Sequence, residues 1–272
     1  GFNRQIKEEF RITPFLVEAD EKLYYRNRMD FAVFPEKLIG LHQAGNFRRV
    51  VDIDYCHIQN DDANREFQIF RKTLNEFPEI IFNRKTEEGF LKYATYRRGV
   101  FTDDNIFILT FAKGFENTAT EKKLEEKLLQ SLKSKNIVFC YNRKKAEVSA
   151  SGEFQVIRGN HFYEEELFGK IFMIPFDSFF QPNPKGFMPI LNFIKDRLGS
   201  NKDILVDLFC GSGFFSRVFG DYFSEIIGFD FVESSILEAN KTLKNEFPGK
   251  NIQFTQSNLF GTDEDLFRKV KI

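Results

Sequence analysis

Apolar positions in the first 168 residues alternate with a period of two in several short runs, which predicts strands. In two longer runs they recur at helical spacing, with Phe67, Ile69, Phe70 and Leu74 on one face of the first. The predicted strands cover 24–34, 38–42, 49–53, 90–98, 105–111 and 136–141, and the predicted helices cover 5–10, 61–77 and 119–134. Pro35-Glu-Lys37 predicts a turn between the first two strands. This alternation predicts one α+β domain over residues 1–168.

The pattern over residues 169–272 is more regular. Residues 203–209 form a short, continuously apolar run, as expected of a buried parallel strand. The predicted strands are 203–209, 225–229 and 252–255, and the predicted helices are 187–198, 214–220 and 233–246. This order predicts a doubly wound, Rossmann-like α/β domain. Such sheets commonly have about six strands, so we expect this domain to be C-terminally truncated.

Composition and charge indicate only the general class of the protein. Apolar residues make up 42% and charged residues 29% of the 272-residue chain, which is typical of a folded protein. Residues 1–150 carry 26 Lys and Arg against 23 Asp and Glu, and residues 151–272 carry 13 against 17, a weak sign of a phosphate-facing first half.

Cellular location is indicated by three further features of the sequence. The three cysteines are odd in number and far apart, which argues against a disulfide framework and favours a cytoplasmic protein. No apolar run is long enough to span a membrane or to serve as a signal peptide. The chain begins with Gly1 instead of Met, so we expect a part of a longer protein.

The segment from Asp207 to Ser216 is the strongest functional signal. Gly211 and Gly213 follow a strand, where a backbone must approach a ligand closely. Asp230 ends the next strand, where a carboxylate can accept both ribose hydroxyls of an adenosine group, and Asn258 follows the third. Ser216 occupies the position where an NAD fingerprint has its third glycine, so the pattern favours S-adenosylmethionine.

Two residues of this segment have alternative interpretations. Asp207 could cap the turn that follows it instead of contacting a cofactor. Cys210 could be taken for a nucleophile, but a small residue packed beneath the cofactor is the preferred interpretation.

Four stretches together resemble the RNA (uracil-C5)-methyltransferases, which form 5-methyluridine in tRNA and 23S rRNA. They are Tyr25-Arg-Asn-Arg-Met-Asp-Phe31, Gly159 to Phe172, Ser178-Phe-Phe-Gln-Pro-Asn183 and Asp207 to Ser216, and the likeness spans about residues 10–260. The third stretch matches a Ser-Phe-Phe-Gln-x-Asn element and is the most specific. Without the resemblance it reads as an ordinary loop stiffened by proline, with Phe179 and Phe180 in the core.

The resemblance implies roles for individual residues. Gln181 would contact S-adenosylmethionine, and Phe179 would stack on the target uracil of an RNA substrate. The cofactor pocket would be lined by Asp207, Phe209, Gly211, Gly213, Phe214, Asp230 and Asn258. A monomer without membrane association is expected.

The sequence departs from the family pattern at both ends. The Asp-Pro-Pro-Arg stretch, the nucleophilic Cys and the base Glu of the family are expected beyond Ile272, so we expect the segment alone to be inactive. Many relatives that act on rRNA hold a [4Fe-4S] cluster, and Val51 to Ile58 resembles the strand that carries its fourth ligand, here Cys56. Three more cysteines would have to precede Gly1, since one cannot hold a cluster. A buried free Cys56 and a structural His57 are the alternatives.

Two other functions stay open at this stage. The chain could be a non-catalytic RNA-binding relative of these enzymes. It could also be a methyltransferase for proteins or small molecules, which the match in the N-terminal half disfavours.

Overall fold

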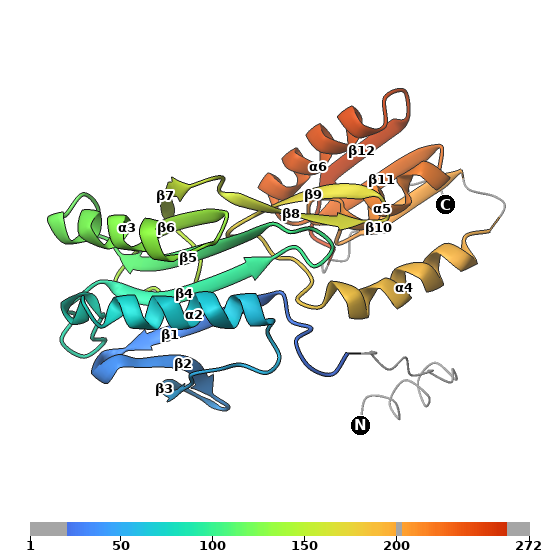
Figure 1. The fold of residues 1–272 in the computed structure, drawn as a ribbon. Helices are drawn as coiled ribbons and strands as arrows, with labels where there is room; N and C mark the ends of the chain where they lie inside the picture. The colour runs from blue at the N-terminus through green and yellow to red at the C-terminus, as the bar shows by residue number, and fades with distance from the viewer. Residues whose placement is uncertain (1–20, 200–202, 260–272) are drawn as a thin grey trace. The chain divides into compact units, whose positions relative to one another are not determined.

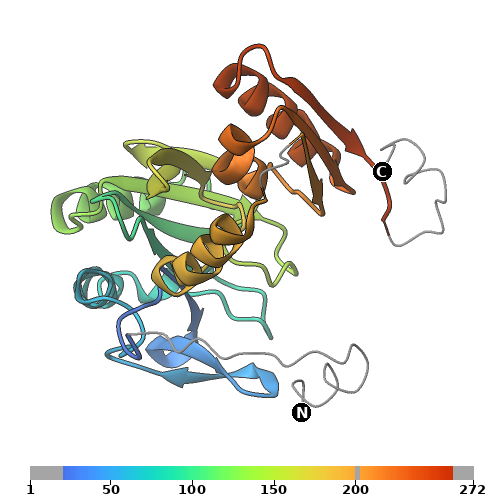
Figure 2. The same cartoon turned by 90° about the vertical axis from the view of Figure 1, so that its right-hand side faces the viewer.

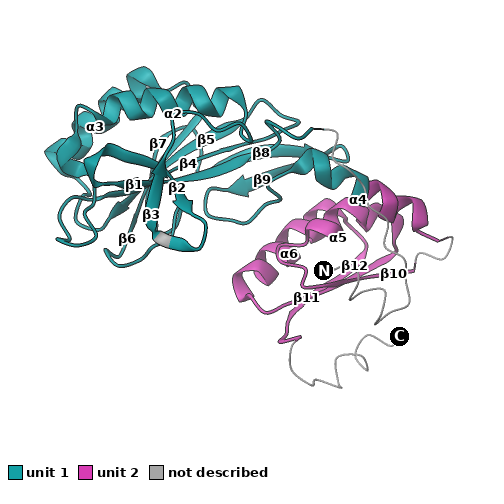
Figure 3. Cartoon of the chain, turned by 90° about the horizontal axis from the view of Figure 1, so that it is seen from below, with its two compact units in different colours: residues 1–190 teal, residues 191–272 magenta. Residues whose placement is uncertain are grey.

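The computed structural model of the chain describes residues 21–199 and 203–259. The helix predicted at 5–10 lies outside these residues. The chain divides into two compact units, residues 1–190 and residues 191–272 (Figure 3). Each unit is described by itself.

Unit 1 is built on a seven-stranded mixed sheet in the order β3-β2-β1-β4-β5-β6-β7 (Figure 1). Only β5 and β6 are parallel, and the other neighbours are antiparallel. The strands are β1 (Arg28–Phe34), β2 (Leu38–Gln43), β3 (Asn46–Asp52), β4 (Leu91–Arg98), β5 (Asn105–Ala112), β6 (Asn136–Asn142) and β7 (Glu153–Arg158). The hairpin predicted at Pro35 to Lys37 is confirmed, with Ala32 opposite Gly40.

Helices α2 (Asp61–Leu74) and α3 (Ala119–Ser131) lie along the same side of this sheet (Figure 3). Each begins at the capping residue that its sequence offers: Asn60 Oδ1 accepts the amide of Ala63, and Thr118 Oγ1 accepts the amide of Glu121. Their apolar faces enter one buried cluster with the sheet, to which Phe67, Phe70, Leu124 and Leu128 belong. The predicted helical periodicity is therefore confirmed for both.

Three details of unit 1 differ from the prediction. The first strand begins at Arg28 and not at Tyr24, because the amides of Tyr24 and Arg26 bond to the carbonyls of His57 and Ile58 instead of to a sheet partner. Strand β7 was not predicted, and its side chains are mostly exposed, so its sequence lacks a buried apolar face. Residues beyond Asp52 leave the sheet, because the Asp52 carboxylate accepts the Ile39 amide and pairs with Arg71.

The hairpin of β8 (Phe162–Leu167) and β9 (Lys170–Pro175) belongs to unit 1. Glu165 of β8 is fully buried and accepts the amides of Val100 (2.7 Å) and Phe101 (2.8 Å), which follow β4. These bonds fasten the hairpin to the end of β4. The boundary between the units consequently falls after residue 190, later than the predicted 168.

Unit 2 holds the parallel strands β10 (Ile204–Leu208), β11 (Glu225–Asp230) and β12 (Asn251–Gln256), in that order. Helix α5 (Phe214–Phe219) follows β10, and α6 (Glu233–Glu246) connects β11 to β12 and runs beside β12 (Figure 2). Helix α4 (Pro184–Arg197) crosses the boundary between the units. Strand, glycine-rich turn, helix, strand, helix and strand follow one another as predicted, and the Rossmann-like fold class is confirmed.

Within residues 21–199 and 203–259, no helix has the length and apolarity needed to span a bilayer.

Candidate functional site: a cofactor loop and a motif loop

The loop that joins β10 to α5 has three residues in the left-handed backbone region. Phe209 has φ 59°, Gly211 has φ 54° and Gly213 has φ 83°. A Cβ on Gly213 would lie 2.8 Å from Leu243 Cδ1, so this glycine lets the loop pack against α6. A Cβ on Gly211 would meet nothing within 4 Å, so the backbone at Gly211 faces open space. Gly211 is therefore the position at which a ligand can approach the main chain.

Asp207 is buried near the end of β10, with 7% of its surface exposed. Its Oδ2 accepts the amide of Ser216 (3.1 Å) and the Ser216 hydroxyl (2.7 Å). Burial raises the pKa of Asp207, and the two bonds from Ser216 partly oppose this shift. Through these bonds Asp207 caps the turn that follows it, which was one of its two interpretations from the sequence. The bonds also fix the first turn of α5 beneath the loop. Contact of Asp207 with a cofactor stays a prediction.

Asp230 ends β11 and lies directly against the loop. Its Oδ2 accepts the amide of Gly211 (2.8 Å), and its Oδ1 accepts the amide of Val232 (2.9 Å). A carboxylate has about four lone-pair directions, so each oxygen keeps capacity for a further donor. The fold therefore places an acceptor for hydroxyl groups beside the open face of Gly211, as the order of strands predicts.

Apolar side chains at the carboxyl ends of β10 and β11 point into solvent. The exposed fraction is 57% for Phe209 and 66% for Phe231. Phe214, the first residue of α5, is half-buried, and Asn258 lies exposed two residues beyond β12. Aromatic rings next to a carboxylate that can accept hydroxyls suit a nucleoside, which has an apolar base and a polar sugar.

Cys210 packs inward from the same loop. It belongs to the buried cluster of unit 2 with Ile226 and Ala239. Burial, together with the carboxylates of Asp207 and Asp230, raises the pKa of its thiol to about 12. Because the thiolate is the reactive form, this environment disfavours a nucleophilic role for Cys210.

The second predicted element, Ser178 to Asn183, is a loop of unit 1 that runs into α4. Phe179 is 78% exposed, so the alternative of a core residue is wrong. Gln181 is half-buried. Asn183 Oδ1 accepts the amide of Gly186 and begins α4, while the carbonyl of Pro182 accepts the amide of Asn27 (2.9 Å). Two of the four stretches that carry the family resemblance, around Asn27 and around Gln181, are thus joined by a main-chain hydrogen bond.

The start of this loop is supported by Arg97, a residue that the sequence reasoning did not select. Its side chain is fully buried, and its guanidinium donates to the carbonyls of Pro175 (3.1 Å) and Phe176 (2.8 Å) and lies over the Tyr163 ring. Burial lowers the pKa of Arg97. The sequence did contain an indication of this buried arginine, the pair Arg97-Arg98 at the end of an apolar strand. Successive side chains of a strand point to opposite faces, so one of the two must point inward.

Cys56 does not lie in a strand, contrary to the prediction, because β3 ends at Asp52. It is buried in the cluster of unit 1, where its amide donates to Asn64 Oδ1 and its carbonyl accepts from Asn64 Nδ2. His57, next to it, is exposed and stands edge-on to Tyr55. The described residues contain no group of three or more His, Cys, Asp or Glu arranged to hold a metal. One cysteine does not make an iron–sulfur site, so these residues alone do not fit a cluster.

Comparison with known proteins adds a family to this geometry. The family model described as tRNA (Uracil-5-)-methyltransferase matches residues 5–258. A protein of Leptospira interrogans (strain 56601) named an uncharacterized RNA methyltransferase is 46% identical over 97% of this chain and 58% of its own length. The tRNA (uracil(54)-C(5))-methyltransferase of Pyrococcus horikoshii is 28% identical over 81% of this chain and 51% of its own length.

Among solved structures, the tRNA (uracil-54, C5)-methyltransferase of Pyrococcus abyssi, in complex with S-adenosyl-L-homocysteine, superimposes with a TM-score of 0.74. The superposition covers 94% of this chain and 61% of the Pyrococcus abyssi chain, at 23% sequence identity. This similarity establishes a shared fold. This chain spans slightly more than half the length of the curated relatives it matches.

Proposed function

The chain belongs to the tRNA (uracil-5-)-methyltransferase family, and we propose that the protein transfers a methyl group from S-adenosylmethionine to C5 of a uridine in tRNA or rRNA. The observation that carries the proposal is the loop after β10, where the open backbone of Gly211 lies within a hydrogen bond of the Asp230 carboxylate. This loop belongs to a chain that matches the family model over residues 5–258.

The residues of unit 2 fit the cofactor. Asp230 would accept the ribose hydroxyls, and Gly211 would let the cofactor approach the main chain. Phe209, Phe214 and Asn258 would line the pocket, Gly213 holds the loop on α6, and Asp207 keeps the loop in place through Ser216. S-adenosylmethionine supplies an activated methyl group with its own leaving group, so the protein mainly has to position the two partners.

The motif loop of unit 1 would serve the RNA. Phe179 presents a nearly free ring, as stacking on an extruded base requires. Gln181 is proposed to contact the cofactor. Arg97 and Asn27 act as positioning residues in this scheme, since they hold the backbone on either side of Phe179.

Methylation of C5 needs a nucleophile that adds to C6 and a base that removes the C5 proton. Among the described residues the three cysteines are all buried. Burial raises the pKa of Cys140 to about 11 and that of Cys210 to about 12. We therefore propose that none of these three cysteines is the nucleophile. The three unpaired cysteines support the further proposal of a cytoplasmic protein. We also propose that the protein acts as a monomer.

The test is methylation by the full-length protein. Unmodified transcripts of tRNA and of 23S rRNA are incubated with methyl-labelled S-adenosylmethionine, digested to nucleosides and separated by mass spectrometry. The expected product is labelled 5-methyluridine from one of the two RNAs. Label on another nucleoside, on protein, or on neither RNA contradicts the proposal, and RNA binding without methyl transfer supports a non-catalytic relative.

A further inference from the structure

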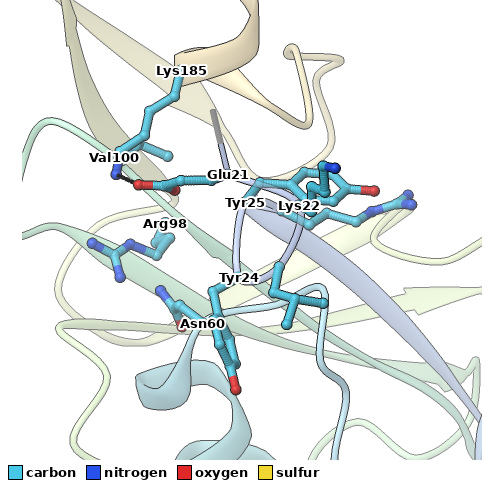
Figure 4. A pocket seen from close by; sticks show the side chains of 10 residues that line it. Glu21, Lys22, Tyr24, Tyr25, Asn60, Arg98, Val100 and Lys185 are labelled. Atoms are coloured by element: carbon cyan, nitrogen blue, oxygen red, sulfur yellow. Dashed lines mark hydrogen bonds and ion pairs between the residues drawn. The ribbon is translucent and has the colours of Figure 1, made fainter. Parts of the chain in front are cut away.

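Unit 1 contains an open cleft of about 640 Å³, which is lined by no residue that the proposed function assigns to the cofactor or to the target base (Figure 4). One wall is the segment from Glu21 to Arg26, which is held by main-chain bonds to His57 and Ile58. The remaining lining residues come from three separate parts of the chain: the N-cap of α2, the end of β4 and the first turn of α4. They are Asn60, Arg98, Val100 and Lys185.

The cleft has a strong excess of positive charge. It is lined by four cationic side chains, Lys22, Arg26, Arg98 and Lys185, and by one carboxylate, Glu21, which pairs with Lys185 at 2.7 Å. The chain as a whole carries a net charge of −1, so this concentration of positive charge is local.

Two of the four cations, Lys22 and Arg26, pair with no carboxylate of the described residues. The guanidinium of Arg26 makes its hydrogen bond through Nε to the Arg28 carbonyl. That of Arg98 donates to the Gly99 carbonyl and approaches Asp62 only to 3.8 Å. Lys22 has no ion pair within the described part of the chain. Guanidinium groups with free donors are the usual partners of phosphate oxygens.

The same cleft offers an aromatic surface and an amide. Tyr24 is 43% exposed, and its hydroxyl lies 3.5 Å from that of Tyr55. Tyr25 lines the cleft beside it. Asn60 uses Oδ1 to cap α2, and its buried Nδ2 has no hydrogen-bond partner in the structure. Cations interleaved with tyrosines are typical of surfaces that bind single-stranded nucleic acid, where phosphates meet the cations and bases stack on the rings.

We propose that this cleft binds a single-stranded stretch of the substrate RNA, outside the nucleotide that is methylated. The inference rests on the proposed function, because that function supplies the RNA. Lys22, Arg26 and Arg98 are the three cations that Glu21 does not pair, and they exceed what a single phosphate group would neutralise, so a polyanion suits the cleft better than a small anion. Lys22, Arg26 and Arg98 contact phosphates, and Tyr24 stacks on a base.

The test measures the affinity of the full-length protein for a fluorescein-labelled, unmodified tRNA transcript by anisotropy at several salt concentrations. Arg26→Gln/Arg98→Gln should weaken binding roughly tenfold at physiological salt and lower the slope of log affinity against log salt by about 1.4, the value for two phosphate contacts to a single strand. Arg26→Lys/Arg98→Lys should keep most of that slope. The matched control is Lys144→Gln/Lys145→Gln, which removes two exposed cations of the same unit.

The outcomes separate the two proposals. Wild type that neither binds RNA nor forms 5-methyluridine overturns the function and the cleft together. Active wild type with unchanged affinity and slope in Arg26→Gln/Arg98→Gln overturns the cleft alone, and so does an equal loss in the control. A chemical denaturation transition like that of wild type establishes that a variant is folded. If the double variant does not fold, Lys22→Gln, at an exposed position, takes its place, and the expected loss of slope is about 0.7, the value for one phosphate contact.

Discussion

Replacing Asp230 by Asn is the sharpest perturbation of the proposed cofactor site, because the side chain keeps its shape and loses its charge. In the structure each carboxylate oxygen accepts one amide, from Gly211 at 2.8 Å and from Val232 at 2.9 Å. Asparagine has one acceptor oxygen, so one of these amides would face an NH₂ group instead. Since bonds to a charged acceptor contribute about 1.5–3 kcal/mol, the free energy of unfolding should fall by about 2 kcal/mol.

Asp230→Asn should also weaken cofactor binding, and by more than the loss of a hydrogen bond to the loop would cause. Loss of the charge removes the strong bonds to the ribose hydroxyls, which corresponds to roughly a 10- to 150-fold increase in the dissociation constant. Calorimetry with S-adenosylhomocysteine on the full-length protein measures this, with chemical denaturation of the same preparation to follow stability. Glu225→Gln is the control, since Glu225 begins the same strand and accepts only from Asn251 among the bonds described.

The two measurements distinguish a ligand contact from a structural anchor. If Asp230→Asn lowers the stability and leaves the affinity for S-adenosylhomocysteine within twofold of wild type, Asp230 only fastens the loop, and its assignment to the ribose is wrong.

Three further predictions concern unit 1. Phe179→Ala in the full-length protein should leave the free energy of unfolding within about 0.5 kcal/mol of wild type, because the ring is 78% exposed. It should slow RNA methylation through a stacking loss of about 1–3 kcal/mol, and unfolding of the variant would contradict this prediction. Gln181→Ala should instead weaken the use of S-adenosylmethionine. Burial raises the pKa of Glu165, so its stabilising contribution is present below about pH 4 and is lost as the pH rises through the raised pKa. The stability of wild type relative to Glu165→Gln should therefore fall in denaturant titrations as the pH rises above about 4, and a constant difference would refute the shift. Full-length protein purified without oxygen should be brown and contain iron and sulfide, and Cys56→Ser should lose the colour; an iron-free protein that methylates RNA would leave Cys56 as a buried thiol.

Local patterns predicted the elements of unit 2 because each strand there pairs with its neighbour in sequence. The apolar run ending at Leu208 and the acid at Asp230 both follow from the order of strands, and parallel strands bring their carboxyl ends to one edge. The partner of Asp207 was not predicted. Ser216 stands where an NAD fingerprint has a glycine, and its hydroxyl donates to the Asp207 carboxylate.

Unit 1 was less predictable where long-range contacts decide the backbone. The segment at Tyr24 has the aromatic residues of a strand, yet its amides bond to a loop more than 30 residues away. Cys56 leaves the sheet because Asp52 is tied to Ile39 and Arg71. No local pattern contains either partner. The basic cleft was not predicted for the same reason. Its residues Lys22, Arg98 and Lys185 are far apart in the sequence and are brought together only by the fold.

Strand β10 lies at the end of the order β10-β11-β12, and this has a consequence for anyone who produces residues 1–272 alone. Its apolar side chains Ile204 and Leu208 are 39% and 45% exposed, and its outer amides and carbonyls pair with no other strand of the described residues. An uncovered apolar strand edge is a template for intermolecular pairing. Such a preparation should self-associate as its concentration rises, and Ile204→Lys, a charge at that edge, should keep it dispersed.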